Sequence, residues 1–537
     1  MNIDAPTRPY ARENTTAWAL PVLILLGLVA RVLFIGNEGF RTDVSSFEAW
    51  ALSLVQHGFA NFYATAGFAD YPPGYFYILA ALGAFYNAVI AGHDPTGFFF
   101  KALVKLPAIA ADLGIGALIY AIVRRFANAG VALTAAAFYL LNPATIYISG
   151  LWGQVDSVAG GFALLALYCL LRSDDEPATQ GVNPWIVGGW VAFTYSLLVK
   201  PQATVLLPLL IAFAFVDPKR RRVRLLSSGI GIAAGLLLAL LLTEPFHPSN
   251  PVDAFVWLLQ RYAYGSNVYA YNTVNAFNLW AIRGAFWQPD GNYILIMPQY
   301  LWGIVLVVAV VALAVWRYAQ ERTSRSLLEG CAIAALAFFL LATRMHERYL
   351  FNGVMLTIVC IPFAKRYVWS AVALSFVLLA NLVYSLQYLT VVSAHTPDVN
   401  SQNLWGVGSQ LLAAVAVATF FYLGYTYLGA PPIEEQSQAP PEERTAPEVA
   451  AFFRARNWFD PREGLTAMRW PLDYVVAAAF GVGNWVLSFI GYWWPPDKVF
   501  DEIYFARAGE EYLHNLRIYE NTHPPLSKLL IAFSMML

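Results

Sequence analysis

The stretch RTDVSSFEAWALSLVQHGFANFYATAGFADYPPG occupies Arg41–Gly74 and directly follows the first long apolar segment of the chain. It carries two aspartates in an aromatic, weakly charged setting: Asp43 lies a few residues beyond the apolar segment, and Asp70 directly precedes Tyr71-Pro72-Pro73. Two consecutive prolines fix two φ angles and disfavour a helix at the residue before them. The sequence therefore predicts a loop that holds Asp70 on a stiff turn, and we interpret the remaining chain as scaffold and binding surface for this loop.

The composition predicts a membrane protein. Hydrophobic residues make up 58% of the 537 residues and charged residues only 12%, whereas a soluble domain carries about 25% charged residues. Apolar runs of roughly 20 residues recur along the chain, and this length crosses a bilayer as a helix. The net charge of −1 offers no field that would attract nucleic acid. We therefore expect an all-α polytopic protein with no nucleic-acid partner.

The apolar runs indicate about thirteen transmembrane helices. The expected spans are Ala17–Ile35, Leu103–Val123, Val131–Ile148, Val158–Leu171, Trp185–Val199, Thr204–Phe215, Leu225–Leu242, Leu301–Trp316, Leu327–Leu341, Leu350–Phe363, Val368–Leu386, Val407–Leu428 and Tyr474–Tyr492. The apolar stretch Tyr75–Ile90 is better interpreted as an interfacial helix of a long first outer loop. With that choice all strong basic clusters fall on one side, as the positive-inside rule requires.

This orientation makes the N-terminus cytoplasmic and gathers ten ionisable residues on the outer face. They are Asp43, Asp70, Asp156, Lys200, Glu244, Arg261, Arg344, His346, Glu347 and Arg348. Ionisable groups close to a bilayer are costly and usually functional. The alternative, solvation at the interface, is reasonable for any one of them but not for the whole set. The sequence therefore predicts a polar site on the outer face.

The long outer loop Glu244–Pro298 is rich in Tyr and Trp. Loops of this length are usually functional or disordered, and the aromatic density argues against disorder. Its aromatic side chains suit either stacking on sugar rings or an aromatic belt at the headgroup layer. The segment 430–469, rich in Pro, Glu and Ala, is predicted to be a cytoplasmic linker, extended and disordered in its first half.

Six motifs within Thr15–Leu428 together resemble the membrane-embedded C-type (GT-C) glycosyltransferases, which take sugars from polyprenyl-phosphate donors. In chain order they are TDVSSFEAWA, ADYPPGY, LWGQVDSVAGGF, LVKPQA, NAFNLW and ATRMHERYLF. The second is similar to the Asp-Tyr-Pro-Pro motif of dolichyl-phosphate-glucose-dependent glucosyltransferases, and the third to a motif of bacterial and glycolipid mannosyltransferases. The resemblance implies the GT-C fold, with a complete transmembrane module over residues 1–429.

The resemblance also implies roles for individual residues. Asp70 is expected to be the general base, and Asp43 to shape or share the catalytic site. Transfer from a polyprenyl phosphate further requires cations for the leaving phosphate, and a planar Arg fork matches phosphate oxygens. The expected donor-phosphate ligands are Arg344, His346, Arg348 and Lys200. The expected substrate-binding residues are Gln154, Asp156, Gln202, Glu347, Asn275 and Asn278.

The C-terminal segment 470–537 resembles the beginning of a second module, from the protein O-mannosyltransferase family. FDEIYF is similar to that family's Asp-Glu pair, and HPPLSK to its His-Pro-Pro-Leu-Gly-Lys motif, with Ser527 in place of Gly. The candidate residues of this module are Asp501, Glu502, His523 and Lys528. The sequence ends about nine residues into the next apolar run, too short to span a bilayer, and we expect a longer natural chain.

These features together predict an inverting hexosyltransferase that moves mannose or glucose from a polyprenyl-phosphate carrier to an outward-facing lipid, glycan or protein acceptor. No cofactor is expected. Some families of this fold hold a divalent metal ion with acids of the first loop, but the two relatives named above need none, and we expect no metal ion. The short loops favour a bacterial plasma membrane. The alternative is a polytopic transporter or lipid-linked sugar flippase, which would show inverted repeats and charge near mid-span. Here the charge lies at the outer ends of the spans.

Overall fold

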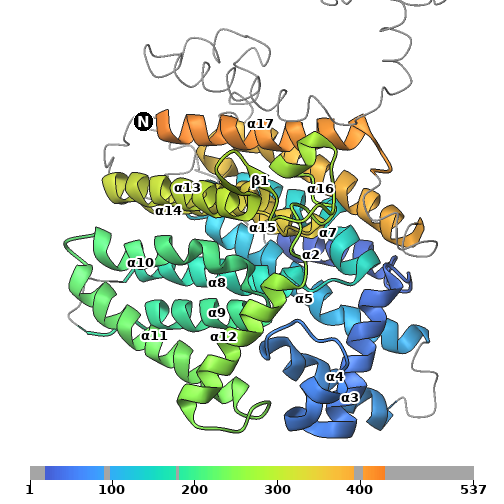
Figure 1. Ribbon diagram of the computed structural model, residues 1–537. Coiled ribbons are helices and arrows are strands. Elements are labelled where there is room, and N and C mark those ends of the chain that lie inside the picture. The colour runs from blue at the N-terminus through green and yellow to red at the C-terminus, as the bar shows by residue number, and fades with distance from the viewer. Residues whose placement is uncertain (1–17, 90–96, 177–180, 392–402, 430–537) are drawn as a thin grey trace, which may run out of the picture. The chain divides into compact units, whose positions relative to one another are not determined.

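The computed structural model describes residues 18–89, 97–176, 181–391 and 403–429. These residues form α-helices almost throughout, with short 3-10 and π-helical turns and one two-stranded hairpin (Figure 1). A bilayer offers no hydrogen-bond partners to the backbone, so a spanning chain must satisfy its N–H and C=O groups within helices. The protein is therefore an all-α polytopic membrane protein, as its composition predicts.

The helices before the long loop alternate with short connections. They are α2 (Ala19–Val32), α3 (Arg41–Thr65), α4 (Gly74–Val89), α5 (Phe98–Val123), α6 (Ala129–Leu140), α7 (Pro143–Ile146), the π-helix η1 (Tyr147–Trp152), α8 (Asp156–Ser173), α9 (Pro184–Val199), the 3-10 helix η2 (Pro201–Leu206), α10 (Leu207–Val216) and α11 (Arg221–Thr243).

The long loop and the helices after it complete the described chain. They are α12 (Pro251–Asn267), η3 (Leu279–Arg283), β1 (Tyr293–Ile294), β2 (Met297–Pro298), α13 (Gln299–Glu321), α14 (Ser324–Leu341), η4 (Glu347–Leu350), α15 (Phe351–Val359), η5 (Ile361–Phe363), α16 (Lys365–Val391) and α17 (Val407–Gly429). Strands β1 and β2 pair in antiparallel register.

The expected number of thirteen spans is not confirmed. Seven helices of the described chain are long and apolar enough to cross a membrane, and an eighth span is formed if α6 and the bent segment Pro143–Trp152 are counted together. Several expected spans are shorter helices instead: α9 has 16 residues, α10 has 10 and α15 has 9. Hydropathy alone does not distinguish a short buried helix from a span. The expected span Tyr474–Tyr492 lies outside the described residues.

The stretch Arg41–Gly74 is mostly helical, which corrects the prediction of a loop. Helix α3 covers its first 25 residues, with a kink at Gly58, where φ is +72°. Only residues 66–73 form a connection, which leads into α4. The predicted interfacial helix is present as α4, and Figure 1 shows it beside α3. Its depth in the membrane stays a prediction. The residues of α3 mix apolar and polar types without a long apolar run, and this composition favoured the interpretation as a loop.

The junction between α6 and α7 is held by a buried guanidinium. Asn142 caps α7, and the two halves meet at an angle of 43°. Arg31, fully buried on α2, donates to the carbonyl oxygen of Leu140 at 2.8 Å and to Thr145 Oγ1 at 3.1 Å. It also forms an ion pair with Asp112 at 2.8 Å. The bend is therefore fixed by contacts from two other helices.

Helix α14 is the central helix of the core. Nearly all of its residues are buried, whereas α13 beside it leaves most of its apolar residues exposed, as expected for a lipid-facing helix. The segment that follows α14, residues 342–346, emerges from this rigid element and leads into η4. A loop that leaves a well-packed helix is positioned more accurately than a free one.

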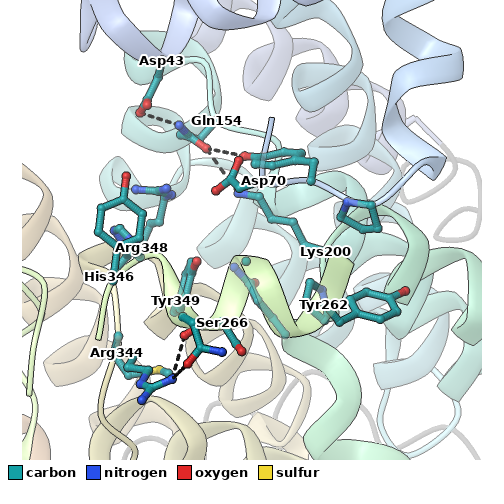
Figure 2. A pocket seen from close by; sticks show the side chains of 18 of the residues that line it. Asp43, Asp70, Gln154, Lys200, Tyr262, Ser266, Arg344, His346, Arg348 and Tyr349 are labelled. Atoms are coloured by element: carbon teal, nitrogen blue, oxygen red, sulfur yellow. Dashed lines mark hydrogen bonds between the residues drawn. The ribbon is translucent and has the colours of Figure 1, made fainter. Parts of the chain in front are cut away.

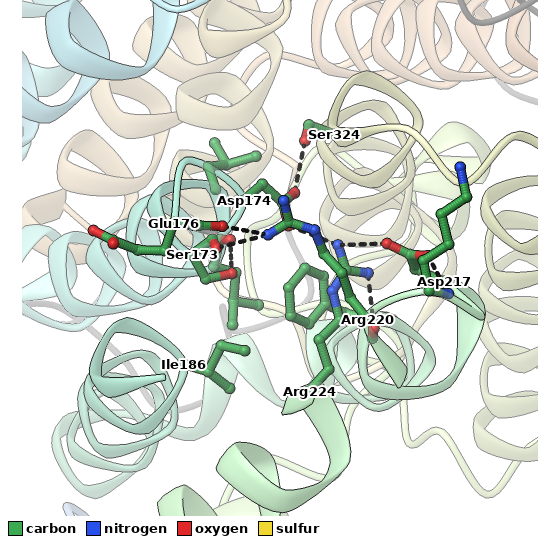
Figure 3. Close-up of polar contacts among 12 residues, drawn as sticks. Ser173, Asp174, Glu176, Ile186, Asp217, Arg220, Arg224 and Ser324 are labelled. Atoms are coloured by element: carbon green, nitrogen blue, oxygen red, sulfur yellow. Dashed lines mark hydrogen bonds and ion pairs between the residues drawn. The ribbon is translucent and has the colours of Figure 1, made fainter. Parts of the chain in front are cut away.

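A polar network joins three elements on the side of the predicted cytoplasmic clusters (Figure 3). Arg224 of α11 forms an ion pair with Asp174, which ends α8, at 2.7 Å, and Ser324 of α14 donates to the same carboxylate at 3.3 Å. Arg220 donates to the carbonyl oxygen of Ser173 at 3.2 Å. The basic residues of this cluster thus close the ends of three helices.

The aromatic loop before α13 is folded against the segment after α14. The backbone N–H of Val274 donates to the carbonyl oxygen of Met345 at 2.9 Å, and that of Arg344 donates to Tyr271 O at 2.9 Å. Asn381 of α16 bonds the main chain of Asn275 and Phe277 at 2.6 and 2.8 Å. Two motifs far apart in sequence, NAFNLW and ATRMHERYLF, therefore form one structural unit.

Candidate active site

The candidate site is a cavity of about 1060 Å³. Its walls come from α3, the turn before α4, the segment after η1, the start of η2, α12, α13, the end of α14 and residues 342–349. Figure 2 shows side chains from these elements facing one another. The predicted catalytic and donor-phosphate residues all line this cavity: Asp43, Asp70, Lys200, Arg344, His346 and Arg348. The predicted convergence of the motifs is thus present in three dimensions.

Asp43 is held in place by two neutral donors. It lies in the first turn of α3, where a carboxylate is favoured by the helix dipole. Its Oδ2 accepts hydrogen bonds from Trp152 Nε1 at 2.8 Å and from Gln154 Nε2 at 2.6 Å. Gly39 permits the approach of the η1 backbone, since a Cβ there would lie 2.7 Å from Trp152 O. Asp43 is therefore a fixed acceptor at one wall.

Asp70 lies on a turn pinned from both sides. Trp50 Nε1 donates to Phe68 O at 2.8 Å, and Tyr63 Oη donates to Tyr71 O at 2.8 Å. The Asp70 side chain is partly exposed to the cavity. Burial raises the pKa of Asp70, and its own backbone hydrogen bond and the nearby Lys200 only partly oppose this. A carboxylate with a raised pKa is a stronger base than an ordinary Asp.

Lys200 and Asp156 form a buried ion pair behind the cavity wall. Lys200 Nζ lies 3.1 Å from Asp156 Oδ2 and 3.2 Å from Gln154 Oε1. Gln202 Nε2 donates to the other Asp156 oxygen at 2.8 Å. Lys200, Gln154 and Gln202 line the cavity, whereas Asp156 is fully buried. Burial lowers the pKa of Lys200, although Asp156 acts in the opposite direction. Asp156 thus orients the cavity side chains of Lys200 and Gln202 rather than facing the cavity.

The segment His346–Arg348 combines a neutral ring with a paired cation. Burial, with the charge of Arg348, lowers the pKa of His346 well below its ordinary value, so the ring is neutral at pH 7 and suits hydrogen bonding more than charge neutralisation. Arg348 Nη1 bonds Glu347 Oε1 at 2.6 Å, and its Nε lies 3.7 Å from Asp156 Oδ2. Glu347 is buried and does not line the cavity, and burial raises its pKa.

Arg344 is engaged by a carboxylate that sequence reasoning did not single out. Its φ is +64°, and its Nε lies 2.6 Å from Asp290 Oδ2. Thr343 Oγ1 also donates to Asp290, at 2.9 Å, and Arg344 Nη1 bonds Ser266 O and Asn267 Oδ1 at the end of α12. Arg344 therefore connects α12, the aromatic loop and the segment after α14. Figure 2 shows its contact with Ser266 at the end of α12. Asp290 lies in none of the six motifs, so the sequence did not indicate that it pairs with Arg344.

Asp290→Asn is expected to lower the free energy of unfolding by about 1.5–3 kcal/mol, the value of a hydrogen bond to a charged group. The Arg344 guanidinium loses its counter-charge and keeps two neutral acceptors, Ser266 O and Asn267 Oδ1. Thermal unfolding of the purified full chain measures this effect. Asp253→Asn, at an exposed carboxylate of α12, serves as the comparison, and an equal loss in both variants would contradict the assignment.

Asn275 and Asn278 are not among the described residues that line the cavity. Asn275 Oδ1 accepts from Trp287 Nε1 at 2.9 Å, and Asn278 caps η3. They shape the aromatic loop, and their substrate-binding role remains a prediction. Four aromatic cavity residues were not among the predicted site residues: Trp50 and Tyr71, which lie within two of the motifs, and Tyr269 and Tyr300, which lie in none. The aromatic density of these two regions of the sequence was the available signal.

Two further expectations lie beyond what the structure tests. The second-module candidates Asp501, Glu502, His523 and Lys528, like the linker, fall outside the described residues. Within the described ranges, no group of three or more His, Cys, Asp or Glu side chains has an arrangement that could hold a metal ion. Metal independence of the reaction stays a prediction.

Comparison with known proteins gives a family match over one third of the chain. Residues 70–247 match the family model described as dolichyl-phosphate-mannose-protein mannosyltransferase. This range contains Asp70, Gln154, Lys200 and Gln202. No curated protein matches the chain significantly.

Two solved structures are similar at low identity. Both are the Archaeoglobus fulgidus oligosaccharyltransferase. The apo form has 13% identity and a TM-score of 0.42, covering 80% of this chain and 58% of that one. The form tethered with an acceptor peptide has 12% identity and a TM-score of 0.39, covering 79% and 56%. The matched part thus spans less than two thirds of these relatives.

The family match begins at the Asp70 turn and ends just after α11. It therefore includes Asp70, the Gln154 segment and the Lys200 segment, which form part of the cavity wall. Over residues 70–247 the chain resembles the dolichyl-phosphate-mannose-protein mannosyltransferases, which confirms the resemblance to the membrane-embedded C-type glycosyltransferases.

Proposed function

We propose that this protein transfers a hexose from a polyprenyl-phosphate carrier to a hydroxyl of an outward-facing lipid, glycan or protein acceptor. The observation that carries this proposal is the cavity in which the partly exposed Asp70 carboxylate lies near the cations Lys200 and Arg348. A base and cations in one cavity are what transfer from a phosphate leaving group requires. The family match over residues 70–247 supports the same class of donor.

The proposed reaction is a single displacement. Asp70 takes the proton of the acceptor hydroxyl as its oxygen attacks the anomeric carbon. The bond from that carbon to the phosphate oxygen breaks, and the polyprenyl phosphate leaves with the bonding electron pair. Because attack and departure occur on opposite faces, the anomeric centre is inverted. Arg348 and Lys200 stabilise the charge that grows on the leaving phosphate, and neutral His346 donates a hydrogen bond to it.

The remaining cavity residues are proposed to hold the sugar and the acceptor. Gln154 contacts both Asp43 and Lys200, so its amide is fixed in orientation and suits sugar hydroxyls. Gln202 is fixed in the same way by Asp156. Trp50 and Tyr71 offer aromatic faces next to the Asp70 turn. The name of the matched family favours mannose over glucose as the sugar.

The direct test is sugar transfer by the purified full chain in lipid vesicles. Radiolabelled polyprenyl-phosphate mannose and glucose are supplied separately, with lipid, glycan and peptide acceptors. Transfer of label with inverted configuration supports the proposal. Transport of the intact lipid-linked sugar across the vesicle without any transfer would instead indicate a flippase.

The pH dependence of transfer follows from the environment of Asp70. A general base works when ionised, so kcat/KM falls about tenfold per pH unit below the pKa of that base. Because burial raises the pKa of Asp70, the fall should begin at a higher pH than for an ordinary Asp, whose pKa is about 3.9. A pH profile of kcat/KM measures this, and a profile that stays flat down to the ordinary Asp range would contradict it.

A further inference from the structure

Helix α12 presents an arginine to the cavity in an aromatic setting. Arg261 lines the cavity, and its Cζ lies 5.0 Å from the ring centroid of Tyr63, 5.0 Å from that of Tyr264 and 5.6 Å from that of Trp257. Rings stabilise a guanidinium through cation–π attraction without neutralising its charge. The three rings therefore orient Arg261 and leave its positive charge available.

The other cations of the cavity are already paired. Lys200 lies 3.1 Å from Asp156, Arg344 2.6 Å from Asp290, and Arg348 2.6 Å from Glu347. All three carboxylates are buried, and Asp156 also lies 3.7 Å from Arg348 Nε. A cation compensated in this way attracts a further anion much less than a free one does.

Arg261 differs from these cations in the pairing of its charge. In the portion of the chain that the structure describes, no carboxylate forms an ion pair with it, and its buried Nε, like that of Arg348, has no hydrogen-bond partner. A buried, unsatisfied donor costs about 1–3 kcal/mol, so natural sites rarely keep one without a ligand or water. The guanidinium is thus a preformed site for an anion.

The helix places this guanidinium beside the Asp70 turn. Gly265 lies one helical turn after Arg261, and a Cβ at this glycine would lie 3.1 Å from the carbonyl oxygen of Asp70. Tyr63, which lies under the Arg261 guanidinium, donates to Tyr71 O at 2.8 Å. The unpaired cation and the carboxylate therefore share one part of the cavity wall.

We propose that Arg261 joins Arg348 and Lys200 in binding the phosphate of the lipid-linked donor, whereas Arg344 holds the loops in place. This rests on the proposed function, because only a donor with a phosphate supplies the anion. A phosphodiester carries one negative charge, and the planar fork of Arg bonds two of its oxygens at once. Arg261 was among the outer-face residues in the sequence, but it lies in no motif.

The test uses the full chain in lipid vesicles and two readouts, the Kd for sugar-free polyprenyl phosphate and the KM for the donor. Arg261→Gln is expected to raise both by about tenfold to 100-fold, the range of a charged hydrogen bond, and to leave the melting temperature unchanged. Arg261→Lys should recover part of the affinity, since it restores the charge without the fork. Arg283→Gln, at an exposed arginine of η3 outside the cavity lining, should change neither readout.

The outcomes separate the two claims. If Arg261→Gln keeps the wild-type Kd and KM while Arg344→Gln loses affinity, the inference about Arg261 is overturned and the proposed function stands. If the wild-type protein binds polyprenyl phosphate through Arg261 but transfers no sugar to any acceptor, the proposed function fails and the binding site stands. A loss of affinity in Arg261→Gln that Arg261→Lys does not recover at all, with a lowered melting temperature, would show a structural role instead.

Discussion

Asp70→Asn is expected to lower kcat/KM for sugar transfer by about 10²–10⁴-fold, the usual contribution of a general base. The amide keeps the shape of the side chain but cannot accept the acceptor proton. The turn is pinned through Phe68 and Tyr71 main-chain atoms, so the substitution should leave the fold and donor binding intact. Steady-state kinetics and the Kd for polyprenyl phosphate check this prediction. The substitution should slow the chemical step and leave the Kd unchanged.

Two further variants serve as the control and the comparison for this prediction. Glu244→Gln removes an exposed carboxylate at the end of α11 that does not line the cavity, and it should keep wild-type activity. Asp43→Asn should cost less than Asp70→Asn, since the amide oxygen can still accept from Trp152 and Gln154. A variant at Asp70 with full activity, or a larger loss at Asp43, would reassign the base to Asp43.

Arg31→Met is expected to destabilise the protein by about 3–5 kcal/mol, as for other broken buried ion pairs. The guanidinium is fully buried and its partner Asp112 would remain as an uncompensated buried charge. The carbonyl oxygen of Leu140, at the break before α7, would also lose a donor at 2.8 Å. Unfolding of the full chain by denaturing detergent in mixed micelles measures the loss.

The comparison for this prediction is an exposed ion pair. Lys101→Met breaks a contact with Glu38, whose side chain is 66% exposed, and it should cost less than about 1 kcal/mol. Adding Asp112→Leu to Arg31→Met should restore part of the stability, because it removes the uncompensated charge. A loss below about 1 kcal/mol in Arg31→Met would show that the network contributes little.

The effect of Arg31→Met should extend to the active site. Ser149 donates to Asp112 at 2.5 Å and stands on η1, whose end carries Trp152 and leads into Gln154. Both of these residues donate to Asp43. The buried pair thus positions the wall that holds Asp43, although it lies outside the cavity lining.

Much of the class and part of the site were predictable from the sequence. Low charge and repeated apolar runs of about 20 residues predict a helical membrane protein, because a helix pairs its backbone N–H and C=O groups within the segment that crosses the bilayer. The order of the motifs and the positive-inside rule predicted that the catalytic and donor-phosphate candidates lie on one face. All six of these residues line the cavity. Hydrophobic length did not determine the number of spans, because buried helices such as α10 and α15 are equally apolar.

Only the tertiary structure decided which charged and polar side chains contact one another. Local sequence contains no signal that Asp290 takes up the charge of Arg344, that Asp156 lies behind the wall, or that Asn275 and Asn278 stabilise a loop. These contacts join segments from distant parts of the chain, and the charge that remains for a ligand depends on them. By itself, the sequence predicted which charged residues gather on one face. The packing of α12, the aromatic loop and α14 decided which cations are neutralised, because Coulomb energies depend on distances that only the fold sets. It leaves Arg261 without a carboxylate partner among the described residues.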